Sequence, residues 1–227
     1  MIEVALPGAT ALFTGRAGGV SEGPYASLNL GFLTDDDRAK VDENRRRVAE
    51  RARAALAQGR QVHGTAVARV GEVPGGLLGE ADGAATALEG VAPIVLTADC
   101  LPVALAGGGA VAMLHAGWKG LADGVLEEGV RALRELGGDG DAEAVIGPGA
   151  GACCYQVGAE VAERFPHWAM VGTNLDLKAV AATRLREAGV ARVHDVGRCT
   201  MCEPEVFFSH RRSGGVTGRQ AGLVWRS

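Results

Sequence analysis

The chain has 227 residues, of which 47% are hydrophobic and 22% charged, and this composition excludes an intrinsically disordered protein. With 23 Lys and Arg against 27 Asp and Glu, the net charge of −4 provides no basic surface for nucleic acid and no polybasic membrane patch. The odd number of cysteines, five, argues against a disulfide scaffold and favours reduced thiols in the cytoplasm. No export signal is expected, because Pro7 and Gly8 interrupt the first apolar run.

Helices are predicted at three places along the chain. The first covers 35–57, where Val41, Val48 and Leu56 follow helical spacing. A second covers 119–136 and a third 177–188, each followed by glycine. Strands are predicted near 10–14, 61–70, 92–97, 101–106, 110–115, 143–147, 192–196, 205–209 and 222–226.

The apolar stretch 91–114 has the length of a membrane helix and carries one charge, Asp99. Pro93, Pro102 and the glycines at 107–109 divide it into pieces of strand length, so we expect buried strands and no membrane span. Because strands outnumber helices and several follow each other directly, we predict an α+β fold. It should be a single domain over 1–227, with mixed β-sheets and helices packed outside.

Cys100 and His115 come together if the chain forms a hairpin between them. With Gly107-Gly108 as a two-residue type I′ turn, Ala106 pairs with Gly109 and Cys100 lies opposite His115. Their Cβ atoms would then be roughly 5 Å apart. This expectation depends on the register, which a shifted turn or a bulge would change.

Two kinds of chemistry are open to this pair, beside the simpler possibility that all these side chains belong to the core. In a Cys–His dyad, His115 would take the proton of Cys100 and leave a nucleophilic thiolate. In a metal site the pair needs a third ligand, and His63 is the best candidate. Two imidazoles, a thiolate and one open position are typical of catalytic zinc.

The other four cysteines predict no second site. Cys199-x-x-Cys202 is similar to half of a zinc knuckle, and its only thiol partners are Cys153 and Cys154. Because adjacent cysteines lack the usual ligand spacing, we do not expect these four to bind a metal.

Ten short sequence blocks stand out along the chain. The most specific are TADCLPV at 97–103 and HAGWKG at 115–120. The others are GRAGGVS at 15–21, SLNLG at 27–31, ENR at 43–45, QVHG at 61–64, IGPGA and CCYQVG at 146–158, and FFSHRR with TGRQ at 207–220. Together and in this order they resemble the YfiH family, which is the laccase-domain family long labelled multicopper polyphenol oxidase. The resemblance covers nearly the whole chain and implies a single laccase-like domain.

The family's zinc ligands match His63, Cys100 and His115, so the resemblance implies one zinc per chain at these catalytic residues. It also implies a purine nucleoside phosphorylase acting on adenosine, inosine, guanosine or methylthioadenosine, and able to deaminate adenosine. Bacterial members are also linked to peptidoglycan editing. The alternative is therefore an amide hydrolase acting on a cell-wall precursor with zinc hydroxide or the Cys100 thiolate. A metal-binding regulatory module is disfavoured, because structural zinc sites usually have four protein ligands.

The older label of a copper oxidase does not fit the histidine content. A multicopper oxidase needs a mononuclear and a trinuclear copper centre, held mostly by imidazoles. The chain has five His, of which His167, His194 and His210 lie outside the expected trio. This excludes a multicopper centre.

Phosphorolysis also requires a phosphate site, and arginines suit phosphate because they form bidentate hydrogen bonds. Arg16, in a glycine-flanked loop, is the first candidate and Arg45 the second, while Asn29 is a candidate for base or sugar. Structural hydrogen bonds are the competing explanation for all three. The expected partners are a purine nucleoside and phosphate, with no nucleic acid or membrane, and the chain is expected to be a monomer.

Overall fold

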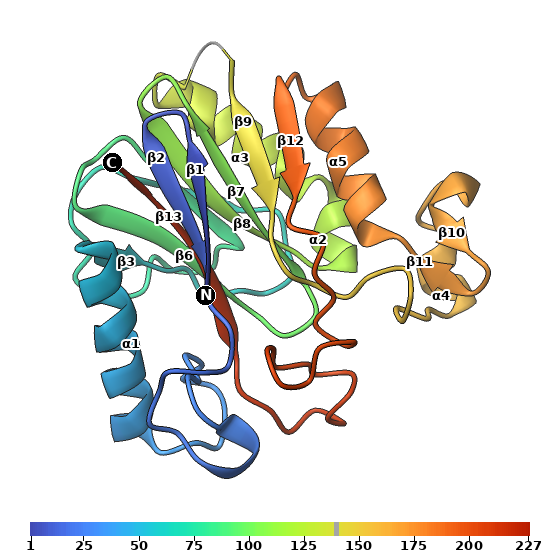
Figure 1. Ribbon diagram of the computed structural model, residues 1–227. Helices are drawn as coiled ribbons and strands as arrows, with labels where there is room; N and C mark the ends of the chain where they lie inside the picture. The colour runs from blue at the N-terminus through green and yellow to red at the C-terminus, as the bar shows by residue number, and fades with distance from the viewer. Residues whose placement is uncertain (139–140) are drawn as a thin grey trace.

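Two β-sheets pack face to face in the computed structural model, which describes residues 1–138 and 141–227 (Figure 1). The five-stranded sheet has the order β1 (Ile2–Leu6), β2 (Ala9–Phe13), β13 (Gln220–Arg226), β6 (Val91–Thr97) and β3 (Ala55–Ala57). The six-stranded sheet has the order β12 (Arg192–Asp195), β9 (Glu143–Ile146), β7 (Leu101–Gly107), β8 (Ala110–Ala116), β5 (Gly83–Thr86) and β4 (Val67–Val70). Each sheet contains antiparallel pairs and at least one parallel pair, so both are mixed, as predicted.

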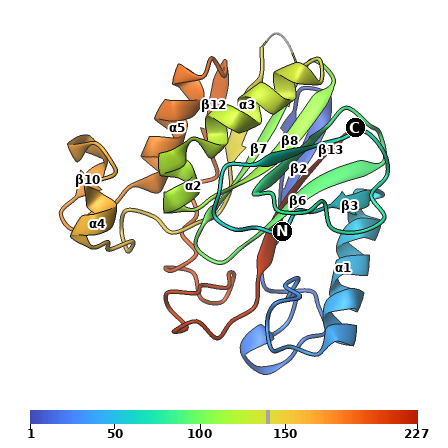
Figure 2. The same cartoon turned by 180° about the vertical axis from the view of Figure 1, so that it is seen from behind.

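Helices cover the outer faces of this sandwich. Seen from behind, α2 (Trp118–Asp123), α3 (Val125–Glu135) and α5 (Leu177–Glu187) lie over the six-stranded sheet (Figure 2). On the other side, α1 (Arg38–Ala52) packs Val48 and Ala52 against the five-stranded sheet. Beyond the sandwich lie α4 (Ala159–Ala162) and the short hairpin of β10 (Met170–Val171) and β11 (Asn174–Leu175). The α+β fold with helices outside is thereby confirmed.

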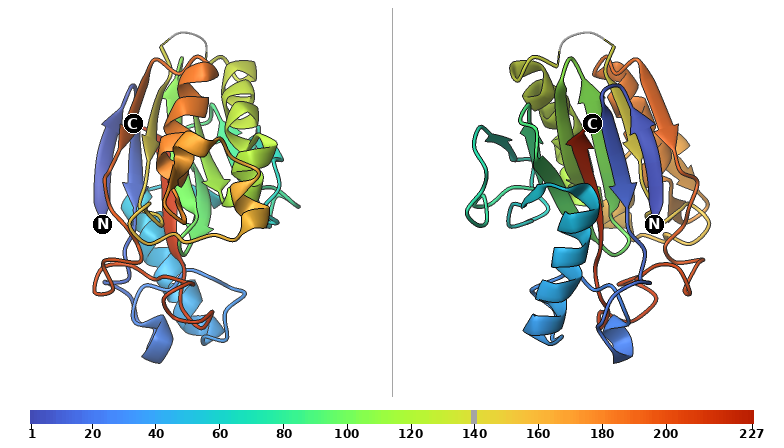
Figure 3. Two further views of the ribbon diagram at one scale, coloured as in Figure 1. Left: turned by 90° about the vertical axis from the view of Figure 1, so that its right-hand side faces the viewer. Right: turned by 60° about the vertical axis from the view of Figure 1, so that its left-hand side comes forward.

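The strand sequences explain the four layers of the fold, which are α2, α3 and α5, the six-stranded sheet, the five-stranded sheet, and α1. Along β7, Val103 and Leu105 belong to the core under the helices, whereas Ala104 and Ala106 belong to the core between the sheets. Strands β8 and β9 alternate in the same way, because successive side chains of a strand point to opposite faces. The central strands are therefore buried on both faces, and the left view of Figure 3 shows α3 and α5 on the side away from β1 and β2.

The hairpin prediction was wrong in register. The turn is formed by Gly108 and Gly109, with φ of 54° and 83°, so Pro102 rather than Cys100 pairs with His115. The type I′ geometry needs positive φ at both central residues, and a third glycine allowed it to form one position later. Moving the turn by one residue moves each partner by two, which preserves the face of every side chain.

Other differences occur where the backbone leaves regular geometry. The helix expected over 119–136 is two helices, separated at Gly124 with φ of 104°. The strand expected at 61–70 begins only at Val67, and the segment 205–209 is a turn and coil instead of a strand. The stretch 91–114 supplies β6, β7 and most of β8, and no helix among the described residues has the length and apolarity to cross a membrane.

Two long loops meet at one end of the sandwich (Figure 1). The segment 14–37 and the segment 197–219 run side by side there, joined by the Arg16 N–H donating to the Val206 carbonyl and the Leu30 N–H donating to the Arg219 carbonyl. These hydrogen bonds hold the two loops against each other at the end of the sandwich.

Candidate active site

His63, Cys100 and His115 converge from three separate segments. His63 lies in the loop between β3 and β4, Cys100 in the bend between β6 and β7, and His115 near the end of β8. Their ligand atoms all lie within 4.8 Å of one another, and Cys100 Sγ is 3.8 Å from His63 Nε2. The structure therefore brings together the three residues that the sequence singled out.

The bend that carries Cys100 takes the chain from one sheet to the other. Asp99, immediately before it, has φ of 96°, a conformation that non-glycine residues rarely adopt. Its buried carboxylate accepts hydrogen bonds from Thr200 Oγ1 (2.7 Å), Ser209 Oγ (3.0 Å) and the Arg211 N–H (2.8 Å). These bonds offset the cost of the backbone conformation and fix the direction in which the next residue, Cys100, points.

Asp82 positions both histidines, although no motif or spacing in the sequence points to it. Its fully buried carboxylate accepts hydrogen bonds from the backbone N–H groups of Val62 (3.0 Å), His63 (2.9 Å) and Gly64 (2.8 Å). Asp82 Oδ1 also lies 2.8 Å from His115 Nδ1. When Nδ1–H donates to this carboxylate, Nε2 is left as the atom that can bind a metal.

Cys100 and His115 shift each other's pKa in opposite directions. Burial raises the pKa of the Cys100 thiol, but the charge of His115 and hydrogen bonds from His115 and His63 outweigh it and lower the pKa to about 6. Burial lowers the pKa of His115, but the Cys100 thiolate and the Asp82 hydrogen bond raise it to about 9. Without a metal, the two shifts together favour a thiolate beside an imidazolium.

The three side chains fit a zinc ion. Two imidazoles and a thiolate around tetrahedral zinc would have ligand atoms about 3.3–3.6 Å apart. Here Cys100 Sγ is 3.8 Å from His63 Nε2, and all three ligand atoms lie within 4.8 Å of one another. A Cβ on Gly117 would lie 2.9 Å from His63 Cδ2 and 3.0 Å from Cys100 Sγ, so glycine is needed beside the ligands. Three protein ligands leave a fourth position for water or substrate, as in catalytic zinc sites.

The three ligands open into a cavity of about 400 Å³, within the range of small-molecule sites. Apolar side chains form much of its wall, including Phe32, Leu33 and Leu96. Thr97 Oγ1 and Gln58 Oε1 are buried in this wall without a hydrogen-bond partner in the described part of the protein. The charged or titratable lining residues outside the trio are Arg60, His210 and Arg219.

Comparison with known proteins gives the family. The family model described as multi-copper polyphenol oxidoreductase laccase matches residues 10–227, nearly the whole chain. The chain belongs to this family, the YfiH family. A Pseudomonas aeruginosa protein named purine nucleoside phosphorylase is 42% identical over 230 residues, covering 95% of this chain and 92% of the relative.

Solved structures of YfiH proteins share the fold. The crystal structure of YlmD from Geobacillus stearothermophilus has a TM-score of 0.88 and 34% sequence identity, covering 97% of this chain and 93% of YlmD. The crystal structure of YfiH from Bacillus licheniformis has a TM-score of 0.91 and 31% identity, covering 96% of this chain and 93% of that protein.

The three residues expected to bind substrate do not line the cavity of this YfiH-family chain. Arg16 donates to the carbonyls of Ala26 and Pro204, which joins the two long loops. Arg45 donates to the Leu30 carbonyl and stacks over Phe32, 4.5 Å from the ring centroid. Direct contact of these arginines with a substrate stays a prediction, and the contacts seen here support the cavity wall instead.

Asn29, the third of these residues, is fully buried and its hydrogen bonds are all made within the protein. Its amide N–H groups donate to Thr34 and Asp36, and its oxygen accepts from the backbone N–H groups of Gly31 and Arg219. Asn29 therefore positions Arg219, which does line the cavity.

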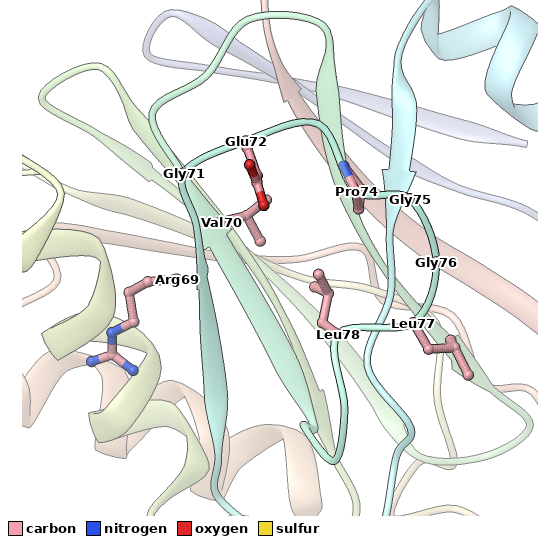
Figure 4. Close-up of a pocket in the computed structure, with 9 residues that line it drawn as sticks. All are labelled: Arg69, Val70, Gly71, Glu72, Pro74, Gly75, Gly76, Leu77 and Leu78. Carbon is pink, nitrogen blue, oxygen red and sulfur yellow. The ribbon is translucent and has the colours of Figure 1, made fainter.

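A second cavity, of about 470 Å³, lies within the loop 70–78 that follows β4 (Figure 4). Arg69 points away from it in Figure 4 and is paired with Glu128 and Glu135 of α3. Most of its lining is backbone, glycine and apolar side chain, so it offers no group of converging polar atoms.

Proposed function

We propose that this YfiH-family protein is an enzyme that cleaves purine nucleosides with phosphate, in the cavity beside His63, Cys100 and His115. The observation that carries the proposal is a set of three possible metal ligands, His63, Cys100 and His115, that opens into a cavity with apolar walls. A half-buried arginine, Arg219, lies in the same wall. Relatives named purine nucleoside phosphorylase, which this chain matches over most of their length, support it.

One zinc ion per chain, held by His63 Nε2, Cys100 Sγ and His115 Nε2, is part of this proposal. A zinc ion bound there supplies a Lewis acid and lowers the pKa of a water toward neutrality. Zinc is favoured over copper because the donor set is a thiolate with two imidazoles. Of the other histidines, His210 lines the cavity, whereas His167 and His194 are exposed elsewhere.

Arg219 is the residue we propose for phosphate binding. Its Nη1 donates to the carbonyls of Thr217 and Gly218, which holds the guanidinium in place at the cavity wall. Burial lowers the pKa of Arg219, and the negative charges of Cys100 and Asp99 offset this only in part. A guanidinium in this position can bind two phosphate oxygens while the apolar walls hold the base.

Deamination of adenosine by the same site belongs to the proposal as a second activity. Zinc deaminases use a carboxylate that is not a ligand to move the proton. None of the described residues that line the cavity is Asp or Glu, so His210 is the side chain placed to do so. This difference makes phosphorolysis the principal activity that we propose.

The test is incubation of metal-analysed protein with adenosine, with and without phosphate, followed by chromatography of the products. Adenine with ribose 1-phosphate, formed only with phosphate, supports phosphorolysis, and inosine supports deamination. If neither product forms with the zinc-loaded protein, the proposal is wrong, and amide hydrolysis of a cell-wall precursor is the activity to assay.

Arginine variants identify the phosphate site. Arg219→Gln should raise the KM for phosphate by about tenfold or more, as expected for loss of a charge-assisted pair. Arg16→Gln and Arg45→Gln are the matched controls, because both residues are part-buried and outside the cavity. If one of them raises this KM and Arg219→Gln does not, the phosphate lies where the sequence alone placed it.

A further inference from the structure

Four thiols outside the candidate active site gather into one cluster. Cys153 and Cys154 lie in the turn before Tyr155, and Cys199 and Cys202 lie in the segment after β12. Their sulfurs all lie within 4.8 Å of one another. Cys202 Sγ is 3.4 Å from Cys153 Sγ and 3.0 Å from Cys154 Sγ, and the sulfurs of the adjacent pair are 3.5 Å apart.

These three separations, 3.0–3.5 Å, are shorter than those around one tetrahedral ion, so the sulfurs would move apart by less than about 1 Å to hold it. Thiolates around zinc lie about 3.8 Å from one another, since each Zn–S bond is about 2.3 Å long. The objection from the sequence was that adjacent cysteines lack the usual spacing of ligands. In the structure the turn directs both Cys153 and Cys154 toward Cys202, so the spacing along the chain is no obstacle.

The backbone around Cys199 is built for a thiolate. The Gly151 N–H donates to Cys199 Sγ at 3.3 Å. A Cβ on Gly151 would lie 3.2 Å from Cys153 Sγ and 3.6 Å from Cys199 Sγ, so glycine leaves the sulfurs room. Such N–H bonds to a ligand sulfur orient it and stabilise its charge.

The cluster joins two loops that position Asp99. Gly149 pairs with Cys199, and the Thr200 N–H donates to the Gly149 carbonyl at 3.1 Å. Thr200 Oγ1 donates to the Asp99 carboxylate at 2.7 Å, and the Ala150 N–H donates to the Asp99 carbonyl at 2.8 Å. Both loops that would be joined by an ion therefore contact the residue before Cys100.

We propose that Cys153, Cys154, Cys199 and Cys202 form a second, structural zinc site. Four thiolates close the coordination sphere, which is the arrangement of structural rather than catalytic zinc. The ion fastens the segment after β9 to the segment after β12, and it raises the expected zinc content from one to two per chain. The proposal does not depend on the substrate of the first site.

Zinc content tests the assignment with variants of the full-length protein, purified under reducing conditions. Wild type should contain two zinc ions per chain by elemental analysis. Cys153→Ser with Cys202→Ser should contain one, and Cys100→Ala should also contain one, so that each variant is the matched control for the other. If the double variant keeps both ions, or if wild type holds a single zinc or holds iron in this cluster, the proposal is wrong.

A spectroscopic measurement needs no variant of the cluster. In cobalt-substituted Cys100→Ala protein, the remaining site should give sulfur-to-cobalt charge-transfer bands and the visible bands of a tetrahedral ion. X-ray absorption at the zinc edge of the zinc-loaded variant should show sulfur neighbours only. The competing outcome is a disulfide. To test for it, the protein is reduced, loaded with zinc and exposed to air, and its intact mass is measured. A mass lower by two hydrogens per bridge than that of the reduced protein would contradict the assignment.

Discussion

Asp82 holds His63 and His115, the two proposed metal ligands, in place through four hydrogen bonds, two to each carboxylate oxygen. Oδ1 accepts from the His63 N–H and bonds His115 Nδ1, while Oδ2 accepts from the N–H groups of Val62 and Gly64. Since every partner is a donor, a carboxylate can satisfy all of them and an amide cannot. Asp82 is therefore a positioning residue whose charge matters as much as its shape.

Asp82→Asn should lower zinc affinity at this site by about 10–100-fold, as loss of a partner behind a metal-ligating histidine typically does. The amide NH2 would face buried N–H groups in either orientation, so we also expect a loss of about 1–3 kcal/mol of stability. Competition with a chelator measures the first effect, and urea unfolding of the metal-free protein the second. Asp123→Asn, at an exposed ion pair with Arg164, is the control and should change neither measurably. Unchanged zinc affinity in Asp82→Asn would contradict this role.

The pKa of Cys100 predicts how the thiol reacts once metal is removed. A pKa lowered to about 6 means that the thiolate predominates above that pH, so the rate of alkylation of Cys100 should rise through about pH 6. An ordinary cysteine would show this rise near pH 8.5. His115→Gln should move the midpoint upward, because it removes the positive charge. Iodoacetamide labelling across pH, with the modified peptide mapped by mass spectrometry, measures it.

Zinc-loaded protein should behave in the opposite way, with Cys100 alkylated slowly and turnover of nucleoside abolished by chelation and restored by zinc. Rapid inactivation of the zinc-loaded enzyme, with Cys100 as the modified residue, would instead identify a Cys–His nucleophile.

At the scale of elements, a glycine inside α3 is required by the strand beneath it. A Cβ on Gly129 would lie 2.2 Å from Leu114 Cδ1 of β8 and within 2.9 Å of two further atoms of that side chain. Glycine in a helix interior normally costs about 1 kcal/mol relative to alanine. Here that cost permits α3 to lie close against the six-stranded sheet.

Gly129→Ala should therefore destabilise the protein by about 1–3 kcal/mol, despite its better helix propensity, because it overpacks the core under α3. Urea unfolding measures the change. In the Leu114→Ala background, where the clashing atoms are absent, the same substitution should be neutral or stabilising. A stabilising effect of Gly129→Ala alone would mean that the helix can move away from β8 without loss.

Sequence patterns located elements well where the chain is regular and failed where it serves the site. The apolar runs of β7, β8 and β13 and the helix α5 were predicted within a few residues. The helix expected over 35–57 was predicted too long, because α1 ends at Ala52 and 55–57 form strand β3. The segment 61–66 is not a strand because His63 has φ of 59°, which turns its ring toward Cys100. Phe207 and Phe208 are buried like strand residues, yet the chain there turns to bring Ser209 to Asp99.

His63, Cys100 and His115 were predicted from the sequence, whereas the residues that position them were not. Asp82 sits in a glycine-rich stretch with no spacing that links it to His63 or His115, and only the fold brings them together. The same holds for Cys153 and Cys199, whose loops follow different strands. Hydrophobic periodicity predicts on which face of an element a side chain lies, but not which distant loop it contacts.

At the scale of the whole molecule, the two sheets share one core. Phe13, Val95 and Val224 of the five-stranded sheet pack with Met113 and Val145 of the six-stranded sheet. The bend 98–100 passes directly from β6 to β7 without a linker. Neither sheet can therefore expose its inner face without the other losing its own buried surface.

This shared core predicts that the zinc-loaded chain unfolds as one unit, although chains of this size often populate intermediates. Two tryptophans report on opposite layers, since Trp118 packs in the core under the helices and Trp225 in the core beside α1. Fluorescence of a Trp118→Phe variant and of a Trp225→Phe variant, each also carrying Trp168→Phe, should give the same denaturation midpoint as circular dichroism. The exposed Trp168 is removed because it would report on neither core. Separate midpoints for the two variants would show two folding units and contradict a single domain over 1–227. Coincident midpoints would mean that both sheets unfold together. The site of His63, Cys100 and His115, beside the bend that joins the sheets, would then be lost in the same step.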